Sequence, residues 1–223
     1  MVTPRSVHAS LTPKIASSAS STPSKVLTVA PGGTARAVTR ATPFGYGPSD
    51  LRSAYSLGSA SANRGAGQTI AIVDAYDHPN AASDLANFRS TYGLPAANFR
   101  KVDQRGGTNY PSTDTGWAEE ISLDLDMASA IAPNANILLV EGDSASFEDL
   151  GSAVDQAAAM GATQISNSYG GEEVYGSPYA SDYNHPGIAI TASMGDDGYG
   201  CAWFWEPASR RTRRACRPSA EPR

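Results

Sequence analysis

The feature that most constrains the fold is a succession of short apolar runs separated by capped amphipathic helices. One apolar run covers Thr69–Val73 and ends at Asp74, and another covers Asn136–Glu141. Both are strand-sized and apolar on successive residues, which is typical of central parallel strands buried on both faces. Strands that alternate with helices favour a parallel sheet covered on both sides. We therefore predict a doubly wound α/β fold.

Capping residues and turn residues place the other elements. Helices are predicted over Asn80–Pro95, Asp114–Ala132 and Ser146 to about Met160, a helical turn in Gly45–Leu57, and further strands in Thr163–Gly171 and Gly187–Gly198, with a loop between Pro95 and Asp114. In such folds, ligands and catalytic groups gather at the carboxyl ends of the strands. Asp74, "SYGG" and "GDDG" lie at such ends.

Composition divides the chain into three parts. Residues 1–44 are rich in Ser, Thr, Ala and Pro and predict a disordered lead, in which no apolar core of a signal peptide is visible. An Arg/Ser-rich transit peptide is the alternative interpretation. Residues 45–200 are expected to form the folded domain, and residues 201–223 an atypical Arg-rich tail that contains Cys201 and Cys216. A disulfide between these two cysteines is not deducible from the sequence.

The helix predicted over Asp114–Ala132 carries two acids on its apolar side. Its apolar side is predicted to hold Trp117, Ile121, Met127, Ala128 and Ile131, and its solvent side Glu119, Ser122, Asp126 and Ser129. Glu120 and Asp124 project into the apolar stripe, and residues 117–131 include no Lys, Arg or His. A structural polar network is one interpretation. Two buried carboxyls without a cation also favour shared or shifted protonation, which suits general acid/base chemistry.

Three segments resemble one known family. "EEISLDLDMASAIAPNANILLVE", "QISNSYGG" and "AITASMGDDGYG" resemble the sedolisin family, the serine-carboxyl peptidases, whose fold is similar to that of subtilisin. The likeness covers roughly Gly45–Gly200. It implies that Glu120 is the general base for a serine and that Asp124 supports Glu120. Glu119 is an alternative base by proximity, but the spacing and the helical wheel both reject it.

The resemblance implies two further parts of a peptidase site. Asp196 matches an aspartate that donates a hydrogen bond into the oxyanion hole, although Asp197 stands where the family has serine. The segment "SNSYGG" resembles the family's substrate-binding segment, to which an extended peptide could add its backbone. That segment consists of Ser166, Asn167, Ser168, Tyr169, Gly170 and Gly171.

The sequence departs from the family where the nucleophile is expected. The family's serine lies in a Ser-Gly-Thr-Ser-like turn downstream of the oxyanion aspartate, and this sequence contains no "GTS". Ser193, Ser209 and Ser219 lack the family's surroundings. The tail is interpreted as a natural basic extension, a nucleic-acid-binding arm or a frameshifted or misassembled ending, of which the third is favoured. We therefore expect this chain to be inactive by itself.

Three functions compete. The first is a serine-carboxyl endopeptidase, the second a catalytically dead module that still binds peptides, and the third a domain that binds a small ligand at Asp74 and Asp196. His8, His78 and His185 fit neither a subtilisin-type triad nor a metal cluster. The resemblance implies a peptide or protein substrate, a monomer and an extracellular location. The net charge of −5 and the absence of a long apolar run predict no nucleic-acid or membrane partner. No cofactor is expected in this chain, although full-length family members carry calcium.

Overall fold

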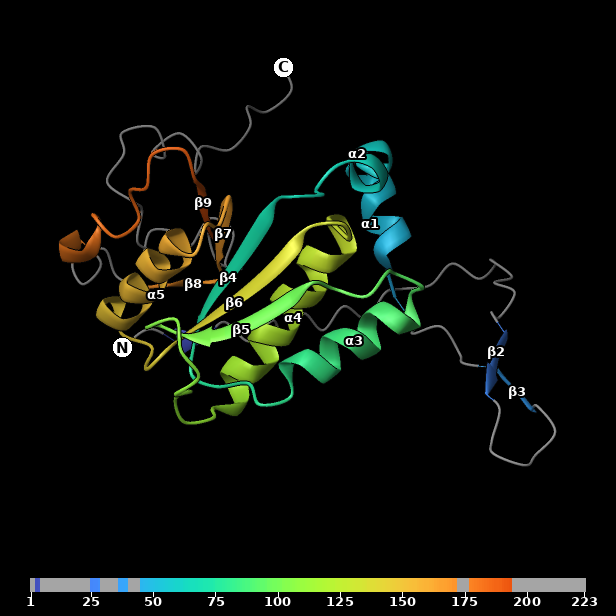
Figure 1. Ribbon diagram of the computed structural model, residues 1–223, viewed down its shortest axis with the longest axis horizontal. Coiled ribbons are helices and arrows are strands. Elements are labelled where there is room, and N and C mark those ends of the chain that lie inside the picture. Colours follow the sequence, from blue (N-terminus) through green and yellow to red (C-terminus); the bar gives the residue numbers. More distant parts are fainter. Residues whose placement is uncertain (1–2, 5–24, 29–35, 40–44, 172–176, 194–223) are drawn as a thin grey trace, which may run out of the picture.

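The computed structural model describes residues 3–4, 25–28, 36–39, 45–171 and 177–193. Its centre is a five-stranded, wholly parallel sheet in the order β5-β6-β4-β7-β9 (Figure 1). The strands of this sheet are β4 (Thr69–Ala75), β5 (Phe99–Asp103), β6 (Asn136–Gly142), β7 (Gln164–Asn167) and β9 (Ala189–Ala192). The helices are α1 (Pro48–Ala54), α2 (Gly58–Asn63), α3 (Ala81–Thr91), α4 (Thr115–Ile131), α5 (Phe147–Ala159) and the 3₁₀ turn η1 (Ser177–Tyr179). The predicted doubly wound α/β fold is confirmed.

Helices cover the sheet on both faces, and alternate residues of each strand contact opposite helices. On one face α3 and α4 pack against Ile72 of β4 and Leu139 of β6. On the other face α5 packs against Val73 and Val140, the next residues along the same strands. The apolar runs that predicted buried strands are therefore explained by a sheet with two buried faces.

β5 is a strand that the sequence did not predict. It pairs with β6 at the edge of the described sheet, where Arg100 is exposed and Lys101 is partly buried. An edge strand needs only a few apolar residues. The segment "FRKVD" therefore lacks the apolar run from which a buried strand is predicted. The prediction of a loop between Pro95 and Asp114 is wrong for this stretch.

The buried face of α4 differs from the predicted wheel at two positions. Met127 was expected in the apolar stripe but is 38% exposed, and Ser129 was expected in solvent but is fully buried. The buried stripe runs along the i, i+4 series that includes Ile121 and Leu125 and reaches Ser129. A serine is tolerated there because its Oγ accepts a hydrogen bond of 3.0 Å from Arg89 Nη1.

Three short strands lie in the segment that was predicted to be a disordered lead. β1 (Thr3–Pro4) pairs antiparallel with β8 (Tyr169–Gly170), while β2 (Lys25–Thr28) pairs antiparallel with β3 (Arg36–Thr39). The composition did not predict these strands. The boundaries at residues 44 and 200 stay predictions, and the tail lies outside the described residues.

Candidate active site

Polar residues form a row across the sheet at the carboxyl ends of its strands. The parallel register places Asp74 of β4 opposite Glu141 of β6, and Glu141 opposite Asp103 of β5. Ser168 follows β7 directly, one residue beyond Asn167, which is paired with the residue before Asp74. Asp74 and Glu141 are both fully buried. The sheet register therefore gathers side chains that are far apart in the sequence at the edge where sites of this fold class lie.

Helix α4 holds the predicted acid pair above this row. Asp114 caps the helix by accepting a hydrogen bond of 3.0 Å from the backbone N–H of Trp117. Glu120 is buried with 5% exposure, and Asp124 is half-buried with its Oδ2 shielded from solvent. Both acids lie on the sheet-facing side of α4, as their spacing indicated.

Ser168 connects the two acids of α4. Its Oγ donates a hydrogen bond to Glu120 Oε1. The same hydroxyl lies close enough to Asp124 to lower the pKa of that carboxyl. Ser168 was predicted only as part of a substrate-binding segment, so its contact with the acid pair is new. A direct hydrogen bond between Glu120 and Asp124 stays a prediction.

The electrostatics of the row favour bound protons. Burial raises the pKa of Asp74 well above its usual value, and the charges of Asp124, Glu120 and Glu141 raise it further. Burial and then the charge of Glu120 raise the pKa of Asp124 to about 7, although the nearby hydroxyl of Ser168 lowers it in part. Several acids at this edge therefore keep protons at weakly acidic pH, which is the condition for carboxyl-based proton transfer.

Asp74 belongs to the acid group rather than to an open ligand site. It is 0% exposed, and neither of its carboxylate oxygens has a hydrogen-bond partner within the described residues. A small ligand could not reach a fully buried carboxylate, so the structure argues against the predicted small-ligand function at Asp74.

One cation, Lys101, contacts the acidic residues on the β5 side of the sheet. Lys101 on β5 forms an ion pair with Asp77 and a second one of 3.1 Å with Glu141 Oε1. Burial raises the pKa of Glu141 to about 7, against the opposing effects of the His78 backbone N–H and of Lys101. Lys101 was not predicted as part of the site, because β5 was not predicted as a strand. The stretch between the two predicted helices contains Arg100, Lys101 and Arg105, and nothing in the sequence distinguishes Lys101 from the other two.

The predicted substrate-binding segment is divided between two strands. Ser166 and Asn167 lie in β7 inside the sheet, between β4 and β9, while Tyr169 and Gly170 form β8 and Gly171 follows it. The hydroxyl of Tyr169 donates a hydrogen bond of 2.8 Å to Asn167 Oδ1 and so ties the two strands together. Within this segment, β8 is the strand that pairs with another extended segment, because Thr3–Pro4 pairs with it in antiparallel orientation.

The histidines contact other partners. His78 Nε2 lies 2.9 Å from Ser122 Oγ and 3.5 Å from Asp84. His185 Nε2 lies 2.8 Å from Asp155. In the described part of the chain, no three His, Cys, Asp or Glu side chains are placed to hold a metal ion together.

Asp196, Asp197 and both cysteines lie outside the described residues. The oxyanion role of Asp196 therefore stays a prediction. The last described residue, Ser193, lies just after β9 and donates a backbone hydrogen bond of 3.0 Å to the carbonyl of Asn167.

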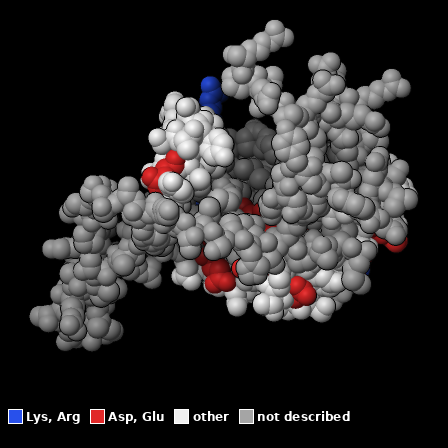
Figure 2. All heavy atoms as spheres, turned by 180° about the vertical axis from the view of Figure 1, so that it is seen from behind, with Lys and Arg blue, Asp and Glu red and all other residues white. Residues whose placement is uncertain are grey.

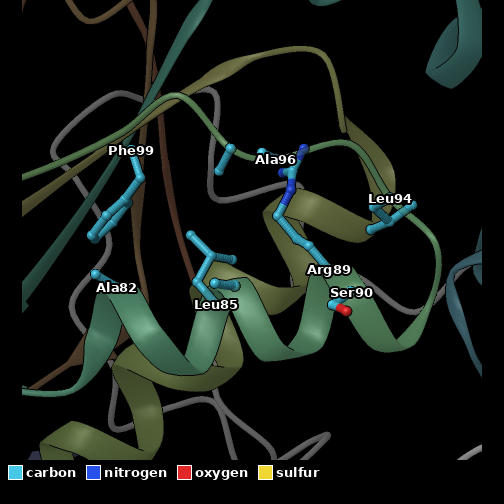
Figure 3. Close-up of a pocket in the computed structure, with 9 residues that line it drawn as sticks. Ala82, Leu85, Arg89, Ser90, Leu94, Ala96 and Phe99 are labelled. Carbon is cyan, nitrogen blue, oxygen red and sulfur yellow. The ribbon is translucent and has the colours of Figure 1, made fainter. Parts of the chain in front are cut away.

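Two surface features lie apart from the acid row. A pocket of about 540 Å³ runs along α3 beneath the loop that leads to β5 (Figure 3). Arg89 crosses this region and donates hydrogen bonds to the carbonyls of Pro95 and Pro133 as well as to Ser129, which indicates a structural role at the carboxyl end of α4.

On the face turned away from the viewer in Figure 1, the visible charges of the described residues are mainly acidic (Figure 2). None of the helices in the described residues could span a bilayer.

The fold and the buried carboxyl row define an α/β domain with a subtilisin-like sheet. No family model matches the chain. It is 34% identical to kumamolisin of Bacillus sp. (strain MN-32) over 101 residues, which are 44% of this chain and 17% of that protein. The structure of Pseudomonas sedolisin, a serine-carboxyl proteinase complexed with two molecules of pseudo-iodotyrostatin, superposes with a TM-score of 0.59 and 25% identity. That match covers 71% of this chain and 46% of the sedolisin chain. This chain is related to the sedolisin family, and it spans less than half of each of these relatives.

Proposed function

We propose that this chain is the base-carrying part of a serine-type endopeptidase of the serine-carboxyl type. The observation that carries the proposal is that buried Glu120 accepts a hydrogen bond from a serine hydroxyl and lies in one charged group with Asp124 and Asp74. The relation to kumamolisin and to Pseudomonas sedolisin supports the same reaction class. The substrate would be a peptide or protein, and the location extracellular.

In the proposed reaction, Glu120 takes the proton of the nucleophilic serine as its Oγ attacks the peptide carbonyl carbon. A C–O bond forms, and the carbonyl oxygen becomes an oxyanion, to which Asp196 would donate a hydrogen bond. Glu120 then gives the proton to the departing amine as the C–N bond breaks, and water hydrolyses the acyl-enzyme. Asp124 would support Glu120 throughout. The family's nucleophile turn is absent from the sequence, so we propose that the chain needs such a segment to act.

The test uses the chain with and without a C-terminal segment that carries the family's nucleophile turn. We expect cleavage of an internally quenched peptide at acidic pH only by the extended chain. Glu120→Gln should lower its kcat/KM by about 10²–10⁴-fold, as for loss of a general base, and Asp196→Ala should remove most of the activity. Glu119→Gln is the matched control, since Glu119 is the exposed neighbour on the same helix. Equal losses for Glu119→Gln and Glu120→Gln would contradict the assignment.

A catalytically inactive peptide-binding module is the second candidate. The observation that favours it is the antiparallel pairing of Thr3–Pro4 with β8, since an external peptide could add to the same strand. A labelled peptide MVTPRSVH, which copies residues 1–8, should bind more tightly to a variant without those residues than to the whole chain. Equal affinities would argue against β8 as the binding strand.

A further inference from the structure

Lys101, on the edge strand β5, contacts several groups around Glu141. Its ammonium group lies 3.1 Å from Glu141 Oε1, forms an ion pair with Asp77 and donates a hydrogen bond of 2.9 Å to the carbonyl of His78. It also lies 4.2 Å from the ring centre of Tyr110. The side chain is only 13% exposed, so solvent screens these contacts weakly. Lys101 is therefore held in one place against Glu141.

Glu141 and Asp74 are neighbours in the parallel ladder, and both are 0% exposed. Neighbouring strands lie about 4.8 Å apart, so two ionised carboxyls at these positions would repel each other strongly. Glu141 Oε2 and both oxygens of Asp74 have no hydrogen-bond partner among the described residues. One proton shared between neighbouring acids relieves this repulsion.

The charged groups around the row differ between its two ends. The groups that face it are Glu120 and Asp124 from α4, Lys101 and Asp103 from β5, Asp77 and His78 from the loop after β4, with Asp84 beside His78, and Tyr169 from β8. The Asp103 carboxylate turns away and accepts hydrogen bonds from the backbone N–H groups of residues 105, 107 and 109. Of the described groups, Lys101 is the cation that contacts the row, and it does so at Glu141.

We propose that Lys101 is a positioning residue that acts through Glu141: it makes Glu141 the first of the two neighbouring carboxyls to lose its proton, so that Asp74, beside Glu120 and Asp124, stays neutral to higher pH. This inference rests on the proposed role of Glu120 as general base. Without the cation, Glu141 would compete for the proton, and Asp74 would become an anion next to the acid pair. The placement of one lysine thus decides which carboxyls are neutral around the base.

The proposal is tested by following individual carboxyl carbons by ¹³C NMR across a pH titration of the whole chain labelled in Asp and Glu. In Lys101→Met we expect Glu141 to titrate at higher pH and Asp74 at lower pH than in the wild-type chain. Glu141→Gln should also move the Asp74 titration to lower pH, because it removes a negative neighbour. Lys101→Arg keeps the positive charge and should leave the Asp74 titration close to that of the wild type.

Arg100→Met is the matched control, because Arg100 is the exposed neighbour on β5 and its side chain points to the opposite face of the strand. Its Asp74 titration should equal that of the wild type. If Lys101→Met does not fold, Lys101→Gln takes its place, because it also removes the cation. An Asp74 titration that is unchanged in the folded variant without the Lys101 cation would overturn the inference. The NMR titration needs no peptide cleavage. The inference about Lys101 can therefore be contradicted while the peptidase assay succeeds, and the peptidase assay can fail while the titrations change as expected.

Discussion

Ser168 donates a hydrogen bond to Glu120 across the gap between the strand region after β7 and helix α4. The two residues are 48 positions apart in the sequence, and the contact exists because α4 lies on the sheet face that β7 also presents. It ties the proposed base to the segment proposed to bind substrate. A peptide seated on β8 would therefore lie close to Glu120.

Replacing Ser168 should change the titration of the acid pair. The hydroxyl stabilises the ionised form of Asp124, so Ser168→Ala should raise the pKa of Asp124 further above its present value of about 7. Ser168→Thr retains the hydroxyl and should change the pKa less. The ¹³C titration of the Asp124 carboxyl measures both effects, and a lower pKa in Ser168→Ala would contradict the described contact.

Stability should fall as the pH rises from about 4 to about 7. The folded chain binds protons at Asp124 and Glu141 more tightly than the unfolded chain does, because the pKa of each is raised to about 7. The unfolded state therefore loses these protons first, and the folded state loses relative stability until the pH passes about 7. For Asp124, a change from 3.8 to about 7 corresponds to at most about 4 kcal/mol.

Asp124→Asn should reduce this pH dependence, because asparagine stays neutral. Urea unfolding should show the variant close to the wild type at pH 4 and more stable than it at pH 8. Glu119→Gln, on the exposed side of the same helix, should leave the slope unchanged. A wild-type chain whose stability increases from pH 4 to pH 7 would contradict the described acid group.

Arg89 should be a main contributor to the attachment of α3 to α4. Arg89 is 2% exposed, and its guanidinium donates hydrogen bonds to Ser129 and to the carbonyls of Pro95 and Pro133. Arg89→Ala leaves the buried acceptors at Ser129 and Pro133 without this donor and should lower the free energy of unfolding by about 2–4 kcal/mol. Arg100→Ala, which removes an exposed arginine, should change it by about 0.5 kcal/mol or less. Urea denaturation at pH 5 compares the two.

The cap of α4 should be worth about 1 kcal/mol. Asp114 accepts a hydrogen bond from the backbone N–H of Trp117, and Asp114→Ala removes it. Asp114→Asn retains a capping oxygen and should cost less. Thermal unfolding of the wild type and of the two variants measures these differences. An Asp114→Ala variant as stable as the wild type would show that the cap contributes nothing.

Local patterns in the sequence determined the fold class and the direction of one acid pair. Strand and helix signals in the chain depend on neighbouring residues, so the runs at β4 and β6 and the capped helices α4 and α5 could be predicted. The four-residue spacing placed Glu120 and Asp124 on one side of α4. The edge strand β5 could not be predicted, because its two apolar residues, Phe99 and Val102, are separated by Arg100 and Lys101 and form no apolar run.

Tertiary structure alone decided which residues surround the acid pair. Ser168, Asp74, Glu141 and Lys101 come from four segments, and only the strand order and the parallel register bring them close to one another. The buried position of Ser129 likewise depends on Arg89 from another helix. Sequence patterns report the periodicity of a single element, whereas the protonation of buried acids depends on charges that arrive from other strands, through distances that only packing fixes.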